Sequence, residues 1–109
     1  MTFSILARNP ETGEIGGAAA TGNLCVGGWV LRGDIKKGVT ASQGFYPSTI
    51  WGENILNNLN KYSPTIATNK VVKNDKQKHY RQVTCLNILG TGFSFTGNKN
   101  TKYFNPVSY

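Results

Sequence analysis

Acidic residues are scarce in this chain of 109 residues, which has 5 Asp and Glu against 12 Lys and Arg and a formal net charge of +7. Because Lys and Arg neutralise phosphates, this imbalance raises nucleic-acid binding as one hypothesis. The alternative, which we favour, is a compositional bias toward lysine and asparagine, which carries no information about binding partners. Charged residues make up only 16% of the chain, so the surface must be polar and largely uncharged.

The basic residues crowd into one stretch that Asp75 alone opposes, namely Lys70, Lys73, Lys76, Lys78 and Arg81. Such a run is typical of a solvated helix end, where cations interact favourably with exposed carbonyl groups. Tyr80 is the only Phe, Trp or Tyr in this stretch, so a platform for stacking single-stranded bases is not supported. We therefore expect no nucleic-acid partner.

Cysteine and histidine are rare as well. Cys25 and Cys85 stand far apart in apolar sequence, and with His79 as the sole histidine they match no zinc-binding spacing. We therefore expect two reduced core cysteines, no metal site and no cofactor. A catalytic pair of Cys85 with His79 is the alternative, but nothing in the sequence brings these two residues together.

Long apolar runs are missing too. No run approaches the length of a membrane span, and the start lacks the basic head and long apolar centre of a signal peptide. The length allows one domain at most. We expect residues 1–109 to form a single cytoplasmic domain with no membrane partner.

The first twenty residues predict a β-hairpin. Thr2 to Arg8 alternates, with Phe3, Ile5 and Ala7 on one side of the strand. Asn9 to Gly13 supplies turn chemistry, since Pro10 presets one dihedral and the glycine allows positive φ. Ile15 to Thr21 is the returning strand, and its small side chains would let another element or a ligand approach the backbone closely.

Further strands are expected at Leu24 to Leu31 and Gly38 to Gln43, joined by a polar link from Arg32 to Lys37. Two helices follow. Ser48 or Thr49 can cap the first, whose apolar face is Ile50, Trp51, Ile55, Leu56 and Leu59. The second begins at Ser63-Pro64, a capping residue with proline at the first helical position.

The last expected strands are Gln82 to Leu89 and Phe93 to Thr96, followed by a polar tail from Gly97 to Tyr109 without a clear period. Two strand hairpins, two helices and a final hairpin predict an α+β domain with helices packed on antiparallel sheet.

Thr2 is the candidate catalytic residue. It stands behind the initiator Met, and small residues there usually allow that Met to be removed, which would leave an α-amine able to activate the Thr2 hydroxyl as a nucleophile. The alternative is a β-prone residue that starts a strand. Ser42 and Gln43 could point into the same cleft, although strand-end hydrogen bonds explain them as well. The turn explains Arg8 and Asn9.

The chain resembles an uncharacterised bacterial and archaeal family, the Domain of Unknown Function 1028 family, from Thr2 to about Asn100. The matching residues are the opening TFSILARNPETGEIGGAAA, Val26-Gly27, the GVTASQ of Gly38 to Gln43, Gly52, Ser63-Pro64, Arg81-Gln82-Val83, Asn87, Gly90 and Thr96-Gly97. The resemblance implies an N-terminal-nucleophile hydrolase fold, an αββα sandwich of two antiparallel sheets between helices. By analogy it also implies amide-bond hydrolysis, and a module that looks peptidoglycan-binding in some members hints at a cell-wall peptide or another small amide as substrate.

Three departures from the family are visible. Family domains run to about twice this length, so the chain corresponds to a truncated first half that leaves the sandwich incomplete. Thr101 to Tyr109 looks unrelated to the family, and the link from Arg32 to Lys37 is unusually charged. Lys36 and Lys37 fall where proteasome-like relatives place a lysine beside the nucleophile, a role this family does not generally keep and which we do not transfer.

Two functions of different class follow. One is an amidohydrolase with Thr2 as nucleophile and a small amide or peptide-like substrate. The other is a non-catalytic binding or oligomerising module, because a truncated sheet would leave an open edge and apolar surface for a partner or a second copy to cover.

Overall fold

The computed structural model describes residues 1–100 and 106–107 of the chain. The elements in chain order are β1 (Thr2–Arg8), β2 (Ile15–Thr21), α1 (Val26–Val30), β3 (Leu31–Asp34), β4 (Gly38–Gly44), α2 (Thr49–Asn58), α3 (Pro64–Val72), the 3-10 helix η1 (Lys78–Tyr80), β5 (Arg81–Asn87) and β6 (Gly92–Thr96). The predicted α+β class is confirmed, with two antiparallel sheets and three α-helices in this part of the chain.

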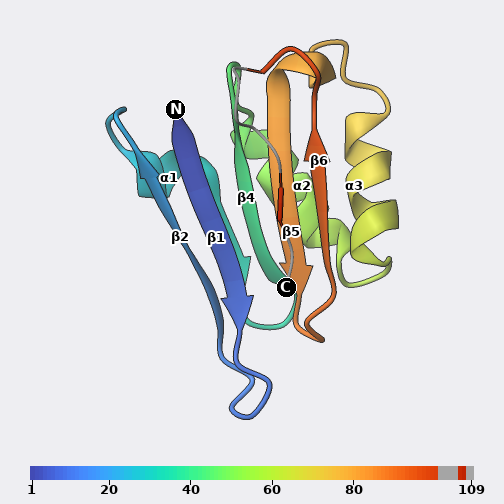
Figure 1. Ribbon diagram of the computed structural model, residues 1–109. Helices are drawn as coiled ribbons and strands as arrows, with labels where there is room; N and C mark the ends of the chain where they lie inside the picture. The colour runs from blue at the N-terminus through green and yellow to red at the C-terminus, as the bar shows by residue number, and fades with distance from the viewer. Residues whose placement is uncertain (101–105, 108–109) are drawn as a thin grey trace.

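The strands form a two-stranded sheet, β1-β2, and a four-stranded sheet in the order β3-β4-β5-β6. The hairpin packs over β4, while α2 and α3 pack against the same four-stranded sheet and against each other (Figure 1). These elements thus make three layers, hairpin, sheet and helices. None of the helices described is long and apolar enough to cross a membrane.

Strand β4 lies at the centre of these layers, and all its residues except the last are buried. Its alternation sends Thr40 and Ser42 toward α2, where their hydroxyls donate to the carbonyl oxygens of Gly52 and Ser48 at 3.1 and 2.7 Å. Gly52 permits this approach, because a Cβ there would lie 3.1 Å from the Thr40 hydroxyl. The residues between them face the hairpin.

The hydrophobic core lies between the helices and the four-stranded sheet, and consists of Trp51, Ile55, Leu56, Leu59, Ala67, Val72, Val83 and Cys85. Both predicted caps are confirmed, since the side chain of Ser48 accepts from the Trp51 N–H and that of Ser63 from the Ile66 N–H. Ile50 differs from the prediction: it is 63% exposed, because it lies outside the arc of α2 that meets the sheet.

The predicted strand from Leu24 to Leu31 is wrong except at Leu31, where β3 begins. A short helix, α1, forms there instead, and the chain enters it through Cys25 in the left-handed conformation at φ 59°. The predicted link also begins too early, because Arg32 to Asp34 belongs to β3 and pairs with β4. Two glycines inside α1 argue against a helix locally, so tertiary packing overrides propensity here.

The exposed turn leaves Cys25 in solvent, which corrects the expectation of two core cysteines. Cys85 is buried as expected, and its thiol lies 3.3 Å from the Thr68 hydroxyl. His79 lies elsewhere, with Nδ1 3.0 Å from the side-chain oxygen of Asn98. The described residues contain no group of three or more His, Cys, Asp or Glu arranged to hold a metal ion.

The final hairpin is shorter than predicted. Strand β5 ends at Asn87 rather than Leu89, because the Asn87 side chain accepts from the N–H groups of Leu89 and Thr91 and so closes the turn. The 3-10 helix η1 within the basic stretch was not predicted. Most of the residues from Thr101 to Tyr109, which we expected to be unrelated to the family, lie outside the described residues.

Candidate functional site

Thr2 is the first residue of β1, and the alternation of that strand turns its side chain toward the four-stranded sheet. The side chain is half-buried. Its hydroxyl donates to the Thr21 hydroxyl at 3.1 Å, directly across the hairpin, and the Thr21 hydroxyl donates to the carbonyl oxygen of Met1 at 3.2 Å. The proposed nucleophile therefore lies at the start of β1, held to β2 by side-chain hydrogen bonds.

Gln43 connects the two sheets at this point. It is 9% exposed, and its Nε2 donates to the backbone carbonyl of Thr2 at 3.2 Å and to Oε1 of Gln82 at 2.7 Å. The Oε1 of Gln43 is buried and has no hydrogen-bond partner among the residues that the structure describes. A buried carbonyl oxygen without a donor is costly, so this atom is poised to accept a hydrogen bond.

Polar groups continue from this point across the hairpin-facing side of the larger sheet. Gln82 donates from Nε2 to the Thr96 hydroxyl at 2.9 Å, and the hydroxyls of Thr84 and Ser94 lie 3.0 Å apart in the next pair on the same face of the β5–β6 ladder. Hydroxyl and amide groups therefore run from β2 through β1, β4 and β5 to β6. We call Thr2, Gln43, Gln82, Thr84, Ser94 and Thr96 the inter-sheet polar surface.

The hairpin covers this surface only in part. β1 contacts β4 and β5, whereas β2 contacts β3 and β4, so β1 is the hairpin strand nearer to β6 (Figure 1). The strand β1 pairs with β2 and with no other strand in the described part of the chain. Its unpaired edge is therefore the one on the side of β5, which β1 contacts.

The other sequence candidates lie apart from Thr2. Ser42 faces α2, on the opposite side of β4 from Gln43. Asn9 serves the turn as predicted, accepting from the N–H groups of Glu11 and Thr12 through its side-chain oxygen. Arg8 differs, because its Nε is buried without a hydrogen-bond partner among the described residues, which the turn does not explain.

Lys37 lies at the other end of β4, about 20 Å from Gln43 along an extended strand. Its Nζ pairs with Asp34 at 3.3 Å and donates to the side-chain oxygen of Asn57 at 2.9 Å. The backbone N–H of Lys36 donates to the Asp34 carboxylate and lowers its pKa below the ordinary value. Both lysines therefore contact Asp34 in the β3–β4 turn, and neither contacts Thr2.

An aromatic cluster that the sequence does not reveal lies at the same end of the sheet as Gln43. The rings of Phe45, Tyr46 and Tyr80 have centroids 4.9 to 6.3 Å apart, and Lys99 Nζ lies 5.3 Å from the Tyr80 ring centroid. Tyr80 joins the cluster because the Tyr46 N–H donates to its backbone carbonyl. The Phe45-Tyr46 pair after the strand is the only local signal for this cluster.

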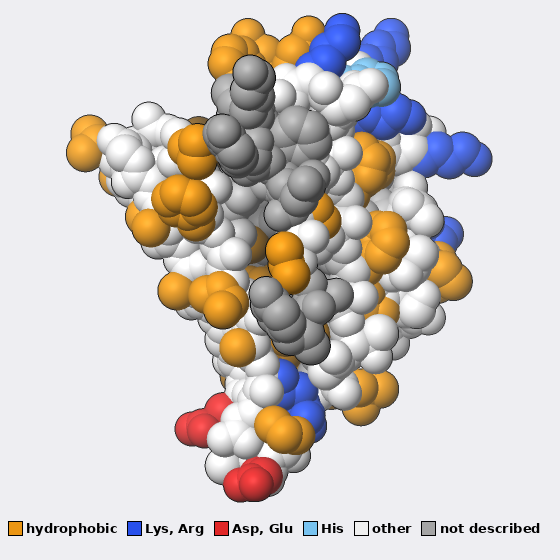
Figure 2. Space-filling model, in the orientation of Figure 1, with side chains coloured by type: hydrophobic (Ala, Val, Ile, Leu, Met, Phe, Trp, Pro, Cys, Tyr) orange, Lys and Arg blue, Asp and Glu red, His pale blue; other side chains and the backbone are white. Residues whose placement is uncertain are grey.

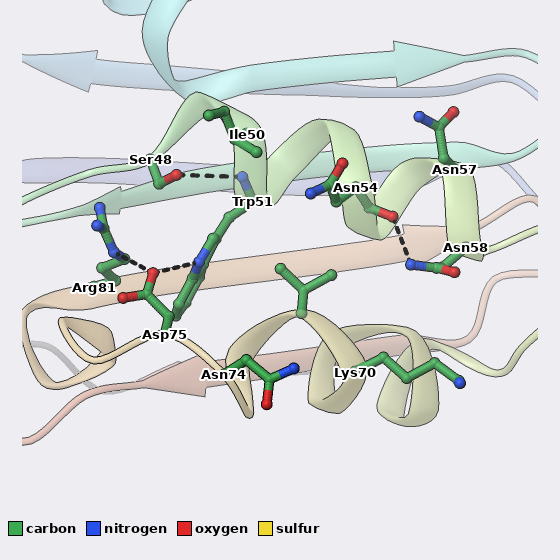
Figure 3. Close-up of a pocket in the computed structure, with 11 residues that line it drawn as sticks. Ser48, Ile50, Trp51, Asn54, Asn57, Asn58, Lys70, Asn74, Asp75 and Arg81 are labelled. Carbon is green, nitrogen blue, oxygen red and sulfur yellow. Dashed lines mark hydrogen bonds and ion pairs between the residues drawn. The ribbon is translucent and has the colours of Figure 1, made fainter.

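A hollow of about 650 Å³ lies between α2 and α3 (Figure 3). Its lining is rich in asparagine, with Asn54, Asn57, Asn58 and Asn74. At one end Asp75 Oδ2 accepts from the Trp51 indole at 2.8 Å and pairs with Arg81 Nε at 2.9 Å. Because Asp75 and Arg81 neutralise each other, we assign them a structural role. They hold α2 and β5 to the loop that follows α3.

Comparison with known proteins adds the family. Residues 2–108 match the model of a family of unknown function, DUF1028. The match extends through residue 108, so the expectation that Thr101 to Tyr109 is unrelated to the family is wrong. The chain belongs to this family. None of the curated proteins matches it. The chain is similar to a protein from Silicibacter pomeroyi of the same family, known from a crystal structure, with 52% sequence identity and a TM-score of 0.96.

The match to the Silicibacter pomeroyi protein covers 99% of this chain but 48% of that protein. This DUF1028 chain therefore spans about half the length of its solved relative. The predicted family is confirmed, and its name carries no activity. The chemistry must be inferred from the arrangement of residues around Thr2.

Proposed function

We propose that this protein is an amide hydrolase of the N-terminal-nucleophile type, with Thr2 as the catalytic residue. The observation that carries the proposal is the position of Thr2, whose half-buried side chain faces the four-stranded sheet while Gln43 donates a hydrogen bond to its backbone carbonyl. Thr2 is thus held by both sheets. Such fixing is what a terminal nucleophile needs.

The reaction begins when Met1 is removed. The α-amine of Thr2 then takes the hydroxyl proton as the Thr2 oxygen attacks the carbonyl carbon of an amide. Backbone N–H groups of a neighbouring loop would hold the oxyanion. The amine returns the proton to the leaving nitrogen, the C–N bond breaks, and an ester to Thr2 remains. Water then hydrolyses the ester, giving a carboxylic acid and the free enzyme.

Gln43 acts as a positioning residue in this scheme. Its amide already donates to the Thr2 carbonyl, and the N–H and C=O of one residue in a strand point to the same side. The unpartnered Oε1 of Gln43 can therefore accept a hydrogen bond from the Thr2 amine. This bond would hold the amine beside the hydroxyl that it must deprotonate.

The substrate class that fits is a small or peptide-like amide. The inter-sheet polar surface offers neutral hydrogen-bonding groups, which suit amides better than strongly charged ligands. The exposed rings of Phe45 and Tyr46, at the same end of β4, offer an apolar surface for a flanking group. A cell-wall peptide is one compound of this class.

Two measurements test the proposal in sequence. Intact-mass analysis should show that the purified protein lacks Met1, because a retained Met1 leaves Thr2 without its base. Thr2→Ala should then reduce hydrolysis of a panel of amide and acyl substrates by on the order of a thousandfold, while Thr2→Ser keeps part of it. The control Thr12→Ala changes an exposed turn residue and should leave the rate unchanged.

The competing function is a non-catalytic binding or oligomerising module. The observation that favours it is the exposure of Phe3 and Ile5, each 65%, on the outer side of β1. Retention of Met1 together with equal behaviour of Thr2→Ala and wild type toward every substrate in the panel would decide for the module.

A further inference from the structure

The groove between α2 and α3 is the hollow of about 650 Å³ shown in Figure 3. It lies on the helix layer, on the far side of the four-stranded sheet from the hairpin and from Thr2. Its volume is within the range of sites that bind small ligands. Of the lining residues, Trp51 belongs to the hydrophobic core and Val71 packs against it. The groove is therefore built on packed residues, and the reaction proposed for Thr2 does not use it.

Asparagine side chains line both sides of this groove. Asn54, Asn57 and Asn58 line it from α2, and Asn74 lines it from the residues just after α3 (Figure 3). Asn58 Nδ2 donates to the backbone carbonyl of Asn54 at 2.9 Å, and Asn57 Oδ1 accepts from Lys37 Nζ. The side chains of Asn54 and Asn74 are exposed and make no hydrogen bond to another residue in the described part of the chain. Both amides, each with donors and an acceptor, are thus available to a ligand.

Helix α2 carries these asparagines against its own propensity. Asparagine is a poorer helix former than Ala, Leu, Lys or Glu. Every asparagine of α2 nevertheless lies in the lining of the groove, and the side chain of Asn54 makes no hydrogen bond to a described residue that would compensate. A residue that breaks a local rule without a structural gain is typical of a functional site. The residue at position 54 therefore indicates a role outside folding.

Positive charge adjoins the groove on the side of α3. Lys70 lines the groove. Lys73 and Lys76 stand on either side of the lining residue Asp75 in the chain, and all three lysines are exposed. Asp75 is the single carboxylate in the described lining, and Arg81 neutralises it at 2.9 Å. Figure 2 shows Lys and Arg side chains gathered at the end of the molecule that carries η1. A ligand in the groove therefore meets uncompensated positive charge.

We propose that this groove binds an acidic oligosaccharide, a short chain of sugar units that carry carboxylate groups. Neighbouring hydroxyl groups of a sugar ring both donate and accept hydrogen bonds, so they match the side-chain amides of Asn54 and Asn74. The carboxylates of the ligand pair with Lys70 and the lysines beside it, which favours acidic sugars over neutral ones. The proposal does not depend on hydrolysis at Thr2, and its test uses no amide substrate.

Two other ligand classes fit the groove less well. Single-stranded nucleic acid needs exposed aromatic rings on which its bases stack, and Trp51, the aromatic residue of the described lining, is only 4% exposed. A peptide needs pockets for its alternate side chains, and the groove offers little apolar surface beyond Ile50 and Val71. Both classes serve as competing probes in the test.

The direct test titrates the full chain with trigalacturonate and, as a neutral control, with the methyl ester of the same trisaccharide. In ¹⁵N-edited NMR spectra, trigalacturonate should shift the side-chain amide signals of Asn54 and Asn74. The methyl ester should bind about fivefold more weakly, because it lacks the charges that pair with lysine. Lys70→Gln should remove most of this difference. Lys61→Gln changes an exposed lysine outside the groove and should leave the difference unchanged.

A second measurement separates binding from folding. The double variant Asn54→Ala with Asn74→Ala should raise the Kd for trigalacturonate about tenfold, since two hydrogen-bonding side chains are lost. Its Tm should not fall, because Ala is the better helix former at position 54. Asn69→Ala is the matched control, because Asn69 is exposed on α3 outside the groove, and it should leave the Kd unchanged.

Three results would overturn the proposal. The first is that trigalacturonate at millimolar concentration shifts neither amide signal. The second is an unchanged Kd in the double variant. The third is that tetraglutamate or a uridine tetranucleotide binds at the same amides as tightly as trigalacturonate, which would make the groove a site for acidic peptides or for nucleic acid instead.

Discussion

The side-chain amide of Gln43 donates a hydrogen bond of 3.2 Å to the backbone carbonyl of Thr2. These residues are 41 positions apart in the chain, and they join the centre of the larger sheet to the first strand of the hairpin. This polar contact ties the hairpin to the larger sheet at the residue that we propose as the nucleophile.

Gln43→Leu should lower the free energy of unfolding by about 1 to 2 kcal/mol, because it removes two hydrogen bonds and leaves the Thr2 carbonyl without its donor. Urea unfolding followed by tryptophan fluorescence measures the loss. Gln77→Leu, which changes an exposed residue before η1, should cost less than half as much. Equal effects of the two variants would mean that the inter-sheet bond contributes no special stability.

Gly17→Ala should destabilise the fold by about 1 to 3 kcal/mol through overpacking. A Cβ at Gly17 would lie 2.7 Å from Leu6 Cδ2 and 2.9 Å from the Ile5 carbonyl oxygen, so the hairpin must shift. The neighbouring Gly16 offers a matched control, since nothing lies within 4 Å of a Cβ there. Chemical denaturation of both variants should show a loss for Gly17→Ala alone; a loss of the same size for Gly16→Ala would point to strand propensity instead.

The two cysteines should differ sharply in reactivity. Cys25 is exposed and should react with a thiol reagent such as iodoacetamide in the folded protein, whereas Cys85 should react only after unfolding. Burial raises the pKa of the Cys85 thiol above its ordinary value of 9.0, so the folded protein keeps this thiol neutral. Peptide mapping after timed labelling measures both rates.

The raised pKa of the Cys85 thiol should also lower the stability of the fold at high pH. The unfolded chain loses the Cys85 proton more readily than the folded protein, so stability is unaffected below pH 9.0 and falls as the pH rises above that value. Cys85→Ser should abolish only this part of the pH dependence. A thiol that labels equally fast at both positions in the folded state would show that Cys85 is not shielded.

Local patterns predicted most elements because each had a strong signal close by in the sequence. The alternation of Thr2 to Arg8 with the turn at Asn9 to Gly13 gave β1 and the turn after it, and Ser63-Pro64 gave the start of α3. The segment around Cys25 failed because its residues carry conflicting signals. Val26 and Val30 favour a strand, and the glycines disfavour a helix, so packing beneath β2 decides.

The sequence predicted the residues of the candidate site but not the contact between them. Thr2 can be recognised from its place behind Met1, and Gln43 from its place at the end of a strand. Their contact could not be derived, because it depends on the hairpin folding over β4 rather than beside it. The aromatic cluster of Phe45, Tyr46 and Tyr80 was missed because it depends on the pairing of β4 with β5, which brings Tyr80 beside Tyr46.

The sequence by itself determined the family, the α+β class and the order of the main elements, because periodicity, caps and turn residues act within a few positions of one another. Tertiary structure alone decided which face of each strand meets water. Phe3 and Ile5 alternate with Thr2 and Ser4 whichever side is buried, and only the packing of the hairpin on β4 turns the polar set inward. That choice is long-range, since it depends on contacts between residues some 40 positions apart, and it turns Thr2 toward the larger sheet and leaves Phe3 and Ile5 exposed.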